Sequence, residues 1–462
     1  MTPTPHPLSG KGIIQHGKIL SLIHDSTLLQ LSSSYSHPYS SDTLTQRIRP
    51  ESTTMTSPFD LRPTTDYFIS SPLLALIYPL HHTLLRLREP KRLQQPLLPT
   101  ESQTETKPPT KTENPEKQQK IRVVCISDTH SLQPPKIPKG DLLIHSGDLC
   151  NNGTIEEIQQ TINWIKTLPH PKKVVISGNH DGYFDPKSRC TDDDKRFMFL
   201  RERFEYQNEK DRYDGGGGFN AKDVFDWGDD IYYLEHDCVT ISFPPQGQVQ
   251  VESAEGQVEK EKETTKKRTL TIYGAPNIPE IVKFGPEHAF TYPPNKDIWK
   301  NTIHDTNNDN IDILITHTPP QSHLDLSPVY STGCPYLLSE TWRIRPKLHV
   351  FGHIHAGYGC EPVFWDEAQI AWERLCHNRR GRSSFSSGSG KLWYGFITFF
   401  KGLLFDLIDL PGWVDVIRVL GFGFWGVLYG NKNGCDCSWM VNAACMYQSS
   451  GRLGNFPQVF DI

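Results

Sequence analysis

The middle of the chain alternates short apolar runs with polar turns. Each run is a few residues long, rich in β-branched side chains and stops at a turn containing Gly or Thr, a pattern typical of buried strands. In open α/β sheets, the side chains that form a site lie just beyond the ends of such strands. We therefore predict strands with functional side chains just beyond their ends. The predicted strands are residues 121–126, 141–145, 173–176, 311–315 and 347–351.

Residues 154–168 carry isoleucines at the spacing of one helix face, between the second and third predicted strands. Thr154 and Glu157 match a capping box, in which each side chain satisfies a backbone N–H at the start of a helix. This alternation of strand and helix predicts an α/β fold.

The sequence divides into a polar leader and one longer domain. Residues 1–120 are dense in Ser, Thr, Pro and Gln, so we predict a low-complexity, mostly disordered leader. Within it, residues 67–86 are apolar but interrupted by Pro72 and Pro79, which predicts a surface helix rather than a membrane span. Residues 121–462 form the predicted domain. Insertions are predicted at about residues 211–222, 245–268 and 361–437.

Residues 391–430, inside the last insertion, concentrate Phe, Trp, Leu and Gly. Charged side chains, among them Lys401, Asp406 and Arg418, interrupt every potential membrane span. We favour a hydrophobic flap packed on the domain. The alternative, an element that makes peripheral contact with a membrane surface, is not favoured.

The overall charge argues against a protein built to hold nucleic acid. The formal net charge is −5 at pH 7, whereas stable binding to a phosphate backbone usually needs a strong basic field. The ten cysteines lack the spacing of a zinc site, and no apolar segment near Met1 resembles a secretory signal. We expect reduced thiols in an intracellular, cytoplasmic protein without a stable nucleic-acid partner.

Five short polar motifs follow the predicted strands. One Gly-Asp or one His alone would be a weak signal, because turns favour Gly and Asp and most histidines are structural. Carboxylate, imidazole and amide oxygen together suit Mn, Fe, Zn or Mg ions. On an extended segment, the outer residues of Asp-x-His or His-x-His point the same way and should converge. The motifs are Asp128-Thr129-His130, Gly147-Asp148, Gly178-Asn179-His180-Asp181, Thr316-His317 and Gly352-His353-Ile354-His355.

Two further histidines are interpreted differently. His145 and His349 lie inside predicted apolar strands. A buried histidine in that setting more often satisfies a backbone group than binds a metal. We expect both to be structural.

The motif set resembles that of the calcineurin-like metallophosphoesterase superfamily, with no member missing, over about residues 121–359. Residues 343–351, 316–320 and 357–359 are similar to a narrower branch, the animal metallophosphoesterase-domain-containing proteins, which are associated with cyclic-nucleotide phosphodiester hydrolysis. The resemblance implies a four-layer α/β/β/α sandwich with mixed sheets. It also implies that residues 440–444 and 458–462 supply closing strands.

The resemblance further implies two divalent metal ions (Mn, Fe, Zn or Mg, with Mn the leading expectation in vitro) that activate a shared water as hydroxide. Asp148 would bridge them. His180 would stabilise charge on the transferring group and protonate the leaving oxygen, and Asp181 would orient the His180 imidazole. The first ion would be held by Asp128, His130 and His355, and the second by Asn179, His317 and His353.

Together these features predict hydrolysis of a phosphodiester, with a cyclic nucleotide or similar small diester as the leading substrate. One alternative is a phosphomonoesterase or a phosphoprotein phosphatase. Another is a nonhydrolytic nucleotide-binding protein of the same fold, which is disfavoured because every ligand type and His180 are present. The sequence does not specify an oligomeric state.

Overall fold

The computed structural model describes residues 71–88, 120–207, 220–244, 268–280, 289–300, 302–303, 311–326, 331–379, 391–430 and 437–462. The chain divides into two compact units, Met1–Thr54 with Phe197–Asp226, and Met55–Arg196 with Trp227–Ile462. Of the first unit, the described part is the end of α5 (Thr191–Gln207) and the 3-10 helix η2 (Ala221–Val224). All elements below belong to the second unit.

The first sheet has five strands in the order β13-β1-β2-β3-β4. Strands β1 to β4 run parallel, and β13 pairs antiparallel with β1 at one edge. In this register Val123 lies opposite Leu142 on one side and Phe460 on the other. The strands are β1 (Arg122–Ile126), β2 (Leu142–Ser146), β3 (Lys172–Ile176), β4 (Ile231–Tyr233) and β13 (Gln458–Asp461).

The second sheet has six strands in the order β11-β12-β10-β9-β6-β5. Its four inner strands are parallel, and both edge strands are antiparallel to their neighbours. The strands are β5 (Asp237–Phe243), β6 (Arg268–Ala275), β9 (Ile313–Thr316), β10 (Leu348–Phe351), β11 (Gly359–Phe364) and β12 (Cys437–Asn442). A separate pair joins β7 (Ile278–Pro279) to β8 (Thr291–Tyr292).

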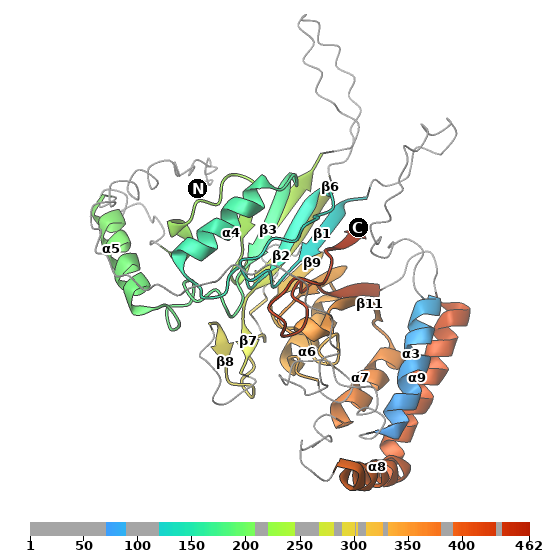
Figure 1. Cartoon of the computed structure of the whole chain (residues 1–462). Helices are drawn as coiled ribbons and strands as arrows, with labels where there is room; N and C mark the ends of the chain where they lie inside the picture. The colour runs from blue at the N-terminus through green and yellow to red at the C-terminus, as the bar shows by residue number, and fades with distance from the viewer. Residues whose placement is uncertain are drawn as a thin grey trace, which may run out of the picture. The chain divides into compact units, whose positions relative to one another are not determined.

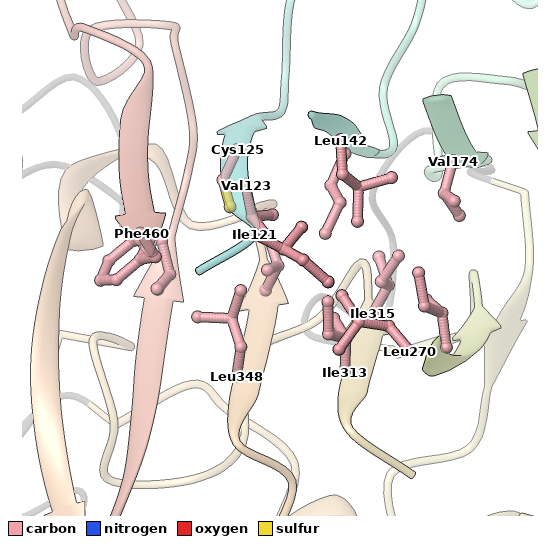
Figure 2. Close-up of a cluster of buried hydrophobic side chains, with 14 of the residues drawn as sticks. Ile121, Val123, Cys125, Leu142, Val174, Leu270, Ile313, Ile315, Leu348 and Phe460 are labelled. Atoms are coloured by element: carbon pink, nitrogen blue, oxygen red, sulfur yellow. The ribbon is translucent and has the colours of Figure 1, made fainter. Parts of the chain in front are cut away.

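The hydrophobic core lies between the two sheets. Figure 2 shows side chains of the first sheet, such as Val123 and Leu142, directed toward Ile313 and Leu348 of the second. Helix α4 (Ile155–Thr167) covers the other face of the first sheet (Figure 1). Helix α6 (Pro335–Ile344) packs on the other face of the second sheet, where Leu337 lies with Tyr273 and Leu314. The four-layer α/β/β/α prediction is therefore confirmed.

Helix α4 begins almost where its sequence pattern predicts, but with half of the predicted capping box. The Thr154 hydroxyl accepts the Glu157 N–H at 3.3 Å. The Glu157 carboxylate instead accepts the backbone N–H of Asn152 at 2.8 Å and its side-chain amide at 2.7 Å. Glu157 therefore stabilises the preceding turn.

Most of the predicted leader lies outside the described residues, with one exception. Helix α3 (Pro72–Arg88) buries Leu74, Ile77 and Leu85, so these residues are not part of a disordered segment. Leu74 and Ile77 pack with side chains of the helices α7 (Glu367–Arg379) and α9 (Leu410–Tyr429) of the last insertion. Figure 1 shows α3 alongside α9.

The last insertion has different limits from those predicted. Strand β11 continues the second sheet to Phe364, and its partner β12 begins at Cys437. The segment between them contains α7, α8 (Lys391–Ile408) and α9. The insertions predicted at 211–222 and 245–268 fall almost wholly outside the described residues.

Candidate metal centre

Five strand ends deliver the predicted site residues to one place. Strands β1, β2 and β3 are parallel neighbours, as are β9 and β10, so within each sheet their carboxyl ends lie together. All nine predicted residues are in loops directly after these strands. Asp128 and His130 follow β1, Asp148 follows β2, Asn179, His180 and Asp181 follow β3, His317 follows β9, and His353 and His355 follow β10.

Four of these side chains form a compact group of potential metal ligands. One ligand atom from each of Asp128, His130, Asp148 and His355 lies within 4.8 Å of the others. His355 Nε2 is 3.2 Å from Asp128 Oδ1 and 3.4 Å from His130 Nε2. The structure thus brings together the ligand set expected for the first ion and the expected bridge.

Asp148 directs its two carboxylate oxygens at different histidines. Its Oδ2 is 3.5 Å from His130 Nε2, and its Oδ1 is 3.3 Å from His317 Nε2. His317 Nε2 is also 2.9 Å from Asn179 Oδ1, and its ring centroid is 5.2 Å from that of His353. The three residues expected at the second ion are therefore grouped around His317, which faces the other oxygen of Asp148.

The backbone at these positions is left-handed, not extended. The φ angle is 50° at Asp128, 46° at His130, 54° at Asp148 and 66° at His353. Such conformations cost roughly 1 to 3 kcal/mol each. Hydrogen bonds between loops hold them, with Asp128 N donating to Gly147 O at 2.9 Å and His130 N to Asp148 O at 3.1 Å. Asp128 and His130 converge as predicted, but because of these turns and not because an extended strand alternates its side chains.

Two glycines allow the loops to approach closely. A Cβ added at Gly178 would overlap the Asp148 carboxylate, and one at Gly352 would overlap that of Asp128. The amide of His353 donates to both Asp128 oxygens, at 3.0 and 3.1 Å. Close packing of backbone against carboxylate therefore fixes the orientation of both acids.

Neighbouring imidazoles compensate the two buried carboxylates. Burial by itself raises the pKa of Asp128, but its hydrogen bond with His355 lowers that pKa to about 2. Burial also opposes ionisation of Asp148, while nearby His317 and His180 hold its pKa well below the usual value. Both acids are therefore anionic at neutral pH, the form that hard cations bind.

The imidazoles respond in opposite directions. Burial lowers the pKa of His317, but attraction to Asp148 outweighs it and raises the pKa to about 9. Burial, together with the His317 charge, lowers the pKa of His353 to about 3. Burial also lowers the pKa of His130 despite the nearby carboxylates. His130 and His353 are accordingly neutral at pH 7, the form that binds a metal, whereas His317 carries a proton that a bound cation would replace.

Backbone carbonyls determine which imidazole nitrogen faces the centre. His317 Nδ1 donates to Ser146 O at 2.9 Å, and His355 Nδ1 donates to Gln448 O at 2.8 Å. Nε2 of each ring therefore faces the carboxylates. Metal-binding histidines are typically oriented in this way by a hydrogen bond from the far nitrogen. Sequence reasoning missed Ser146 and Gln448 because a carbonyl acceptor leaves no trace in residue type.

His180 lies beside the cluster. Its ring meets that of His130 edge-on at a centroid distance of 4.7 Å, and its amide donates to Asp148 Oδ1 at 2.9 Å. Nδ1 of His180 donates to Asn151 O at 2.9 Å. With Nδ1 committed to that carbonyl, proton exchange with a substrate falls to Nε2.

The structure gives Asp181 a different role from the predicted one. The Asn151 carbonyl orients the His180 imidazole, whereas the Asp181 carboxylate is fully buried and ties the loop after β2 to the loop after β3. Burial, followed by the charge of Asp148, raises the pKa of Asp181 to about 6. Its backbone donors are Gly178 N at 2.7 Å, Leu149 N at 3.1 Å and Cys150 N at 3.1 Å.

His145 and His349 contact hydroxyl groups, not the predicted backbone groups. His145 Nε2 is 2.9 Å from Thr129 Oγ1, and His349 Nε2 is 2.9 Å from Thr316 Oγ1. Burial lowers the pKa of His145 to about 4 and that of His349 to about 3, so both rings are neutral. Each ring is hydrogen-bonded to the hydroxyl of a threonine that is next to a candidate ligand in the sequence.

Comparison with known proteins assigns the chain to a family. Residues 121–357 match the family model for calcineurin-like phosphoesterases. The chain belongs to that family. All nine site residues fall within the matched segment.

Individual relatives are similar in sequence to about half of the chain. The chain is 34% identical over 258 residues to the probable rhamnogalacturonate lyase C of Emericella nidulans, covering 55% of this chain and 19% of that protein. It is 32% identical over 246 residues to metallophosphoesterase domain-containing protein 1 of Homo sapiens and of Mus musculus, covering 52% of this chain and 61% of each relative. The chain thus spans less than two thirds of these relatives' lengths.

The donor set fits the divalent ions that calcineurin-like phosphoesterases bind. The carboxylates are anionic, and the far nitrogens of His317 and His355 are fixed by carbonyls. His130 Nε2 lies 3.5 Å from Asp148 Oδ2, so Nε2 is the ring nitrogen of His130 that faces the carboxylates. Mixed oxygen and nitrogen donors without cysteine suit Mn, Fe, Zn or Mg.

Proposed function

We propose that the chain is a metal-dependent phosphoesterase that hydrolyses a phosphodiester at a pair of divalent ions. One observation carries this proposal most strongly. Asp148 lies between two groups of ligand atoms, with one oxygen toward His130 and the other toward His317. A carboxylate shared in this way is the element that a two-metal site needs and a single-metal site does not.

The two ions would be held on either side of Asp148. Asp128, His130 and His355 would hold the first, and Asn179, His317 and His353 the second. Bound there, the ions would polarise phosphoryl oxygens and lower the pKa of water toward neutrality. The protein contributes the fixed carboxylates, the oriented imidazoles and the buried setting in which charge interactions are strong.

His180 would act on the leaving group. Its Nδ1 is held by the Asn151 carbonyl, so Nε2 carries the exchangeable proton. A histidine in this position can stabilise charge developing on the transferring phosphoryl group and protonate the departing oxygen. Asp181 supports this step only indirectly, by holding the loop that carries His180.

For the substrate we propose a small phosphodiester, with a cyclic nucleotide first among the candidates. Support comes from the motif set and from similarity to the metallophosphoesterase domain-containing proteins. The lyase named in the fungal relative is not carried over, because only 19% of that protein is matched. We further propose an intracellular location, which agrees with nine described cysteines that are all free thiols.

The direct test is hydrolysis by protein stripped of metal and then supplied with Mn²⁺. Bis-p-nitrophenyl phosphate, p-nitrophenyl phosphate and cyclic AMP should be compared side by side, with Asp148→Asn as the matched control. We expect Mn-dependent turnover with a higher kcat/KM for diesters. Faster monoester hydrolysis would instead support a phosphomonoesterase or phosphoprotein phosphatase.

A nonhydrolytic nucleotide-binding protein is the second candidate. It would bind the cyclic nucleotide in calorimetry but show no turnover with Mn²⁺, Fe²⁺, Zn²⁺ or Mg²⁺. The presence of all seven candidate ligands and of His180 argues against this outcome, because a binding protein does not need the proton donor.

A further inference from the structure

Helix α9 turns polar and small side chains inward. Its buried residues recur at helical spacing on one face. Val416 and Val419 pack with buried side chains of α3 and α7, including Leu74 and Trp372. Asp415, on the same face, pairs with Arg374 of α7 at 2.9 Å. This face therefore anchors α9 to the rest of its unit.

The opposite surface of α9, together with α8, is apolar and exposed, and we call it the apolar face. Sixteen of the twenty-five exposed large hydrophobic side chains in the described part of the chain belong to these two helices. Surface helices normally show the reverse arrangement, with apolar side chains inward and charges outward. On α9 the exposed fractions are 73% for Leu410, 47% for Val414, 68% for Ile417, 57% for Phe424 and 54% for Leu428. On α8 the exposed members include Phe396, Phe400, Leu404, Phe405, Leu407 and Ile408.

The acidic groups of this helical pair are neutralised on its buried side. Arg379 of α7 lies 3.3 Å from Asp406 and 3.0 Å from Asp409. Asp415 is matched by Arg374 in the same way. The apolar face therefore presents no uncompensated carboxylate among the described residues of α8 and α9.

Basic residues flank the same segment in the sequence. Arg380 and Arg382 precede α8 and Lys391 begins it, whereas Lys432 and Asp436 both follow α9, so the net positive charge lies before α8. No acidic residue occurs between Arg380 and Lys391. An apolar helical surface with basic flanks is complementary to a bilayer that carries negative headgroups.

We propose that the apolar face docks on the surface of a lipid bilayer that contains anionic lipids. Trp413, Trp425 and Tyr429 lie among its exposed residues, and such side chains favour the boundary between headgroups and acyl chains. By length and composition, α9 is also the one described helix able to cross a membrane. Crossing would carry Asp415 into hydrocarbon and break its ion pair with Arg374, so α9 lies along the surface. This site is separate from the metal centre.

Flotation of the full chain with vesicles tests the proposal. Vesicles of phosphatidylcholine alone are compared with vesicles that also contain phosphatidylserine. We expect binding that is stronger with phosphatidylserine and weakened by salt. Equal binding to both compositions would overturn the anionic requirement, and no binding to either would overturn the proposal.

Variants of the apolar face distinguish binding to lipid from binding to a second copy of the chain. The double variant Ile417→Glu, Phe424→Glu should lower the partition coefficient at least about tenfold, since it replaces two apolar side chains of the docking surface with charged ones. Phe199→Glu is a matched control, because Phe199 is 58% exposed and Phe424 57%. It should leave partitioning unchanged. Light scattering in the absence of lipid measures whether the chain forms a dimer. A dimer that Ile417→Glu abolishes, in a protein that binds no vesicles, would show that the apolar face binds a second copy of the chain.

Discussion

Asp128 Oδ1 lies 3.2 Å from His355 Nε2, although 227 positions separate the two residues in the chain. Asp128 follows a strand of the first sheet, and His355 follows a strand of the second. The metal centre therefore depends on the packing of the sheets as well as on the loops. Changes that alter the approach of one loop to another should impair it even when no ligand is removed.

Gly178→Ala should impair the centre by steric overlap with Asp148. The added methyl would fall on the Asp148 carboxylate, so the loop must shift and the acid must turn. We expect weaker Mn²⁺ binding and a loss of roughly 1 to 3 kcal/mol in the free energy of unfolding. Calorimetric titration and denaturant unfolding measure the two effects.

Gly421→Ala is the matched control for that substitution. A Cβ at Gly421, in α9, meets nothing within 4 Å. Alanine in a helix is favoured over glycine by about 0.5 to 1 kcal/mol, so the control should be slightly stabilised with unchanged Mn²⁺ affinity. Equal losses in both variants would contradict the role assigned to the glycine beside Asp148.

His180→Ala should separate catalysis from metal binding. His180 contacts Asp148 through its backbone amide, which the substitution retains. We expect full metal content and a kcat lower by about 10² to 10⁴, the usual contribution of a general acid. His377→Ala, a histidine on α7, serves as the control and should keep its kcat. Normal turnover by His180→Ala would show that the proton donor lies elsewhere.

His323 should make the stability of the chain depend on pH. It is buried, with Nδ1 2.7 Å from Glu361 and Nε2 3.1 Å from Glu373. Burial lowers its pKa, but the two glutamates outweigh this and raise it from 6.5 to about 10. The resulting stabilisation is complete below pH 6.5 and is lost as the pH rises through about 10.

The comparison of the parent chain with His323→Gln tests this linkage. Near pH 6 the variant should be less stable by roughly 3 to 5 kcal/mol, because a buried ion pair loses one partner. The difference should shrink steadily as the pH rises. His81 and His349 also interact with His323, but burial lowers the pKa of both, so they stay neutral in this range. A difference that stays constant with pH would rule out the charged form of His323.

The strands that carry ligands could be predicted from the sequence because each short apolar run is followed directly by residues able to bind a metal. Each buried apolar run ends at a motif that contains Asp, Asn or His, so the same position marks a strand end and a candidate ligand. The predicted strand 121–126 and β1 (Arg122–Ile126), for example, differ by one residue. Helix α4 was predicted equally well from its isoleucines.

Other parts of the site could not be predicted because they depend on tertiary geometry. The carbonyls of Gln448 and Asn151 orient His355 and His180, and any residue type has a carbonyl. The role of Asp181 was misassigned for the same reason. A carboxylate beside a histidine in sequence need not face it, and here it faces backbone amides.

The helices of the last insertion show a further limit. Composition favoured a flap packed on the domain, yet only one face of α9 is packed. A prediction from an amphipathic pattern places charged side chains toward solvent, whereas Asp415 faces Arg374 of α7. Which face is covered depends on the partner helices, which lie at distant positions in the chain.

The proposed bridge between two metal ions is Asp148, and Mn²⁺ titration followed by electron paramagnetic resonance tests this role. We expect two Mn²⁺ per chain with a spin-coupled signal. In Asp148→Asn the coupling should disappear while the far-ultraviolet circular dichroism remains unchanged. A spin-coupled pair that persists in Asp148→Asn, or a single uncoupled Mn²⁺ in the parent chain, would show that Asp148 does not bridge two ions.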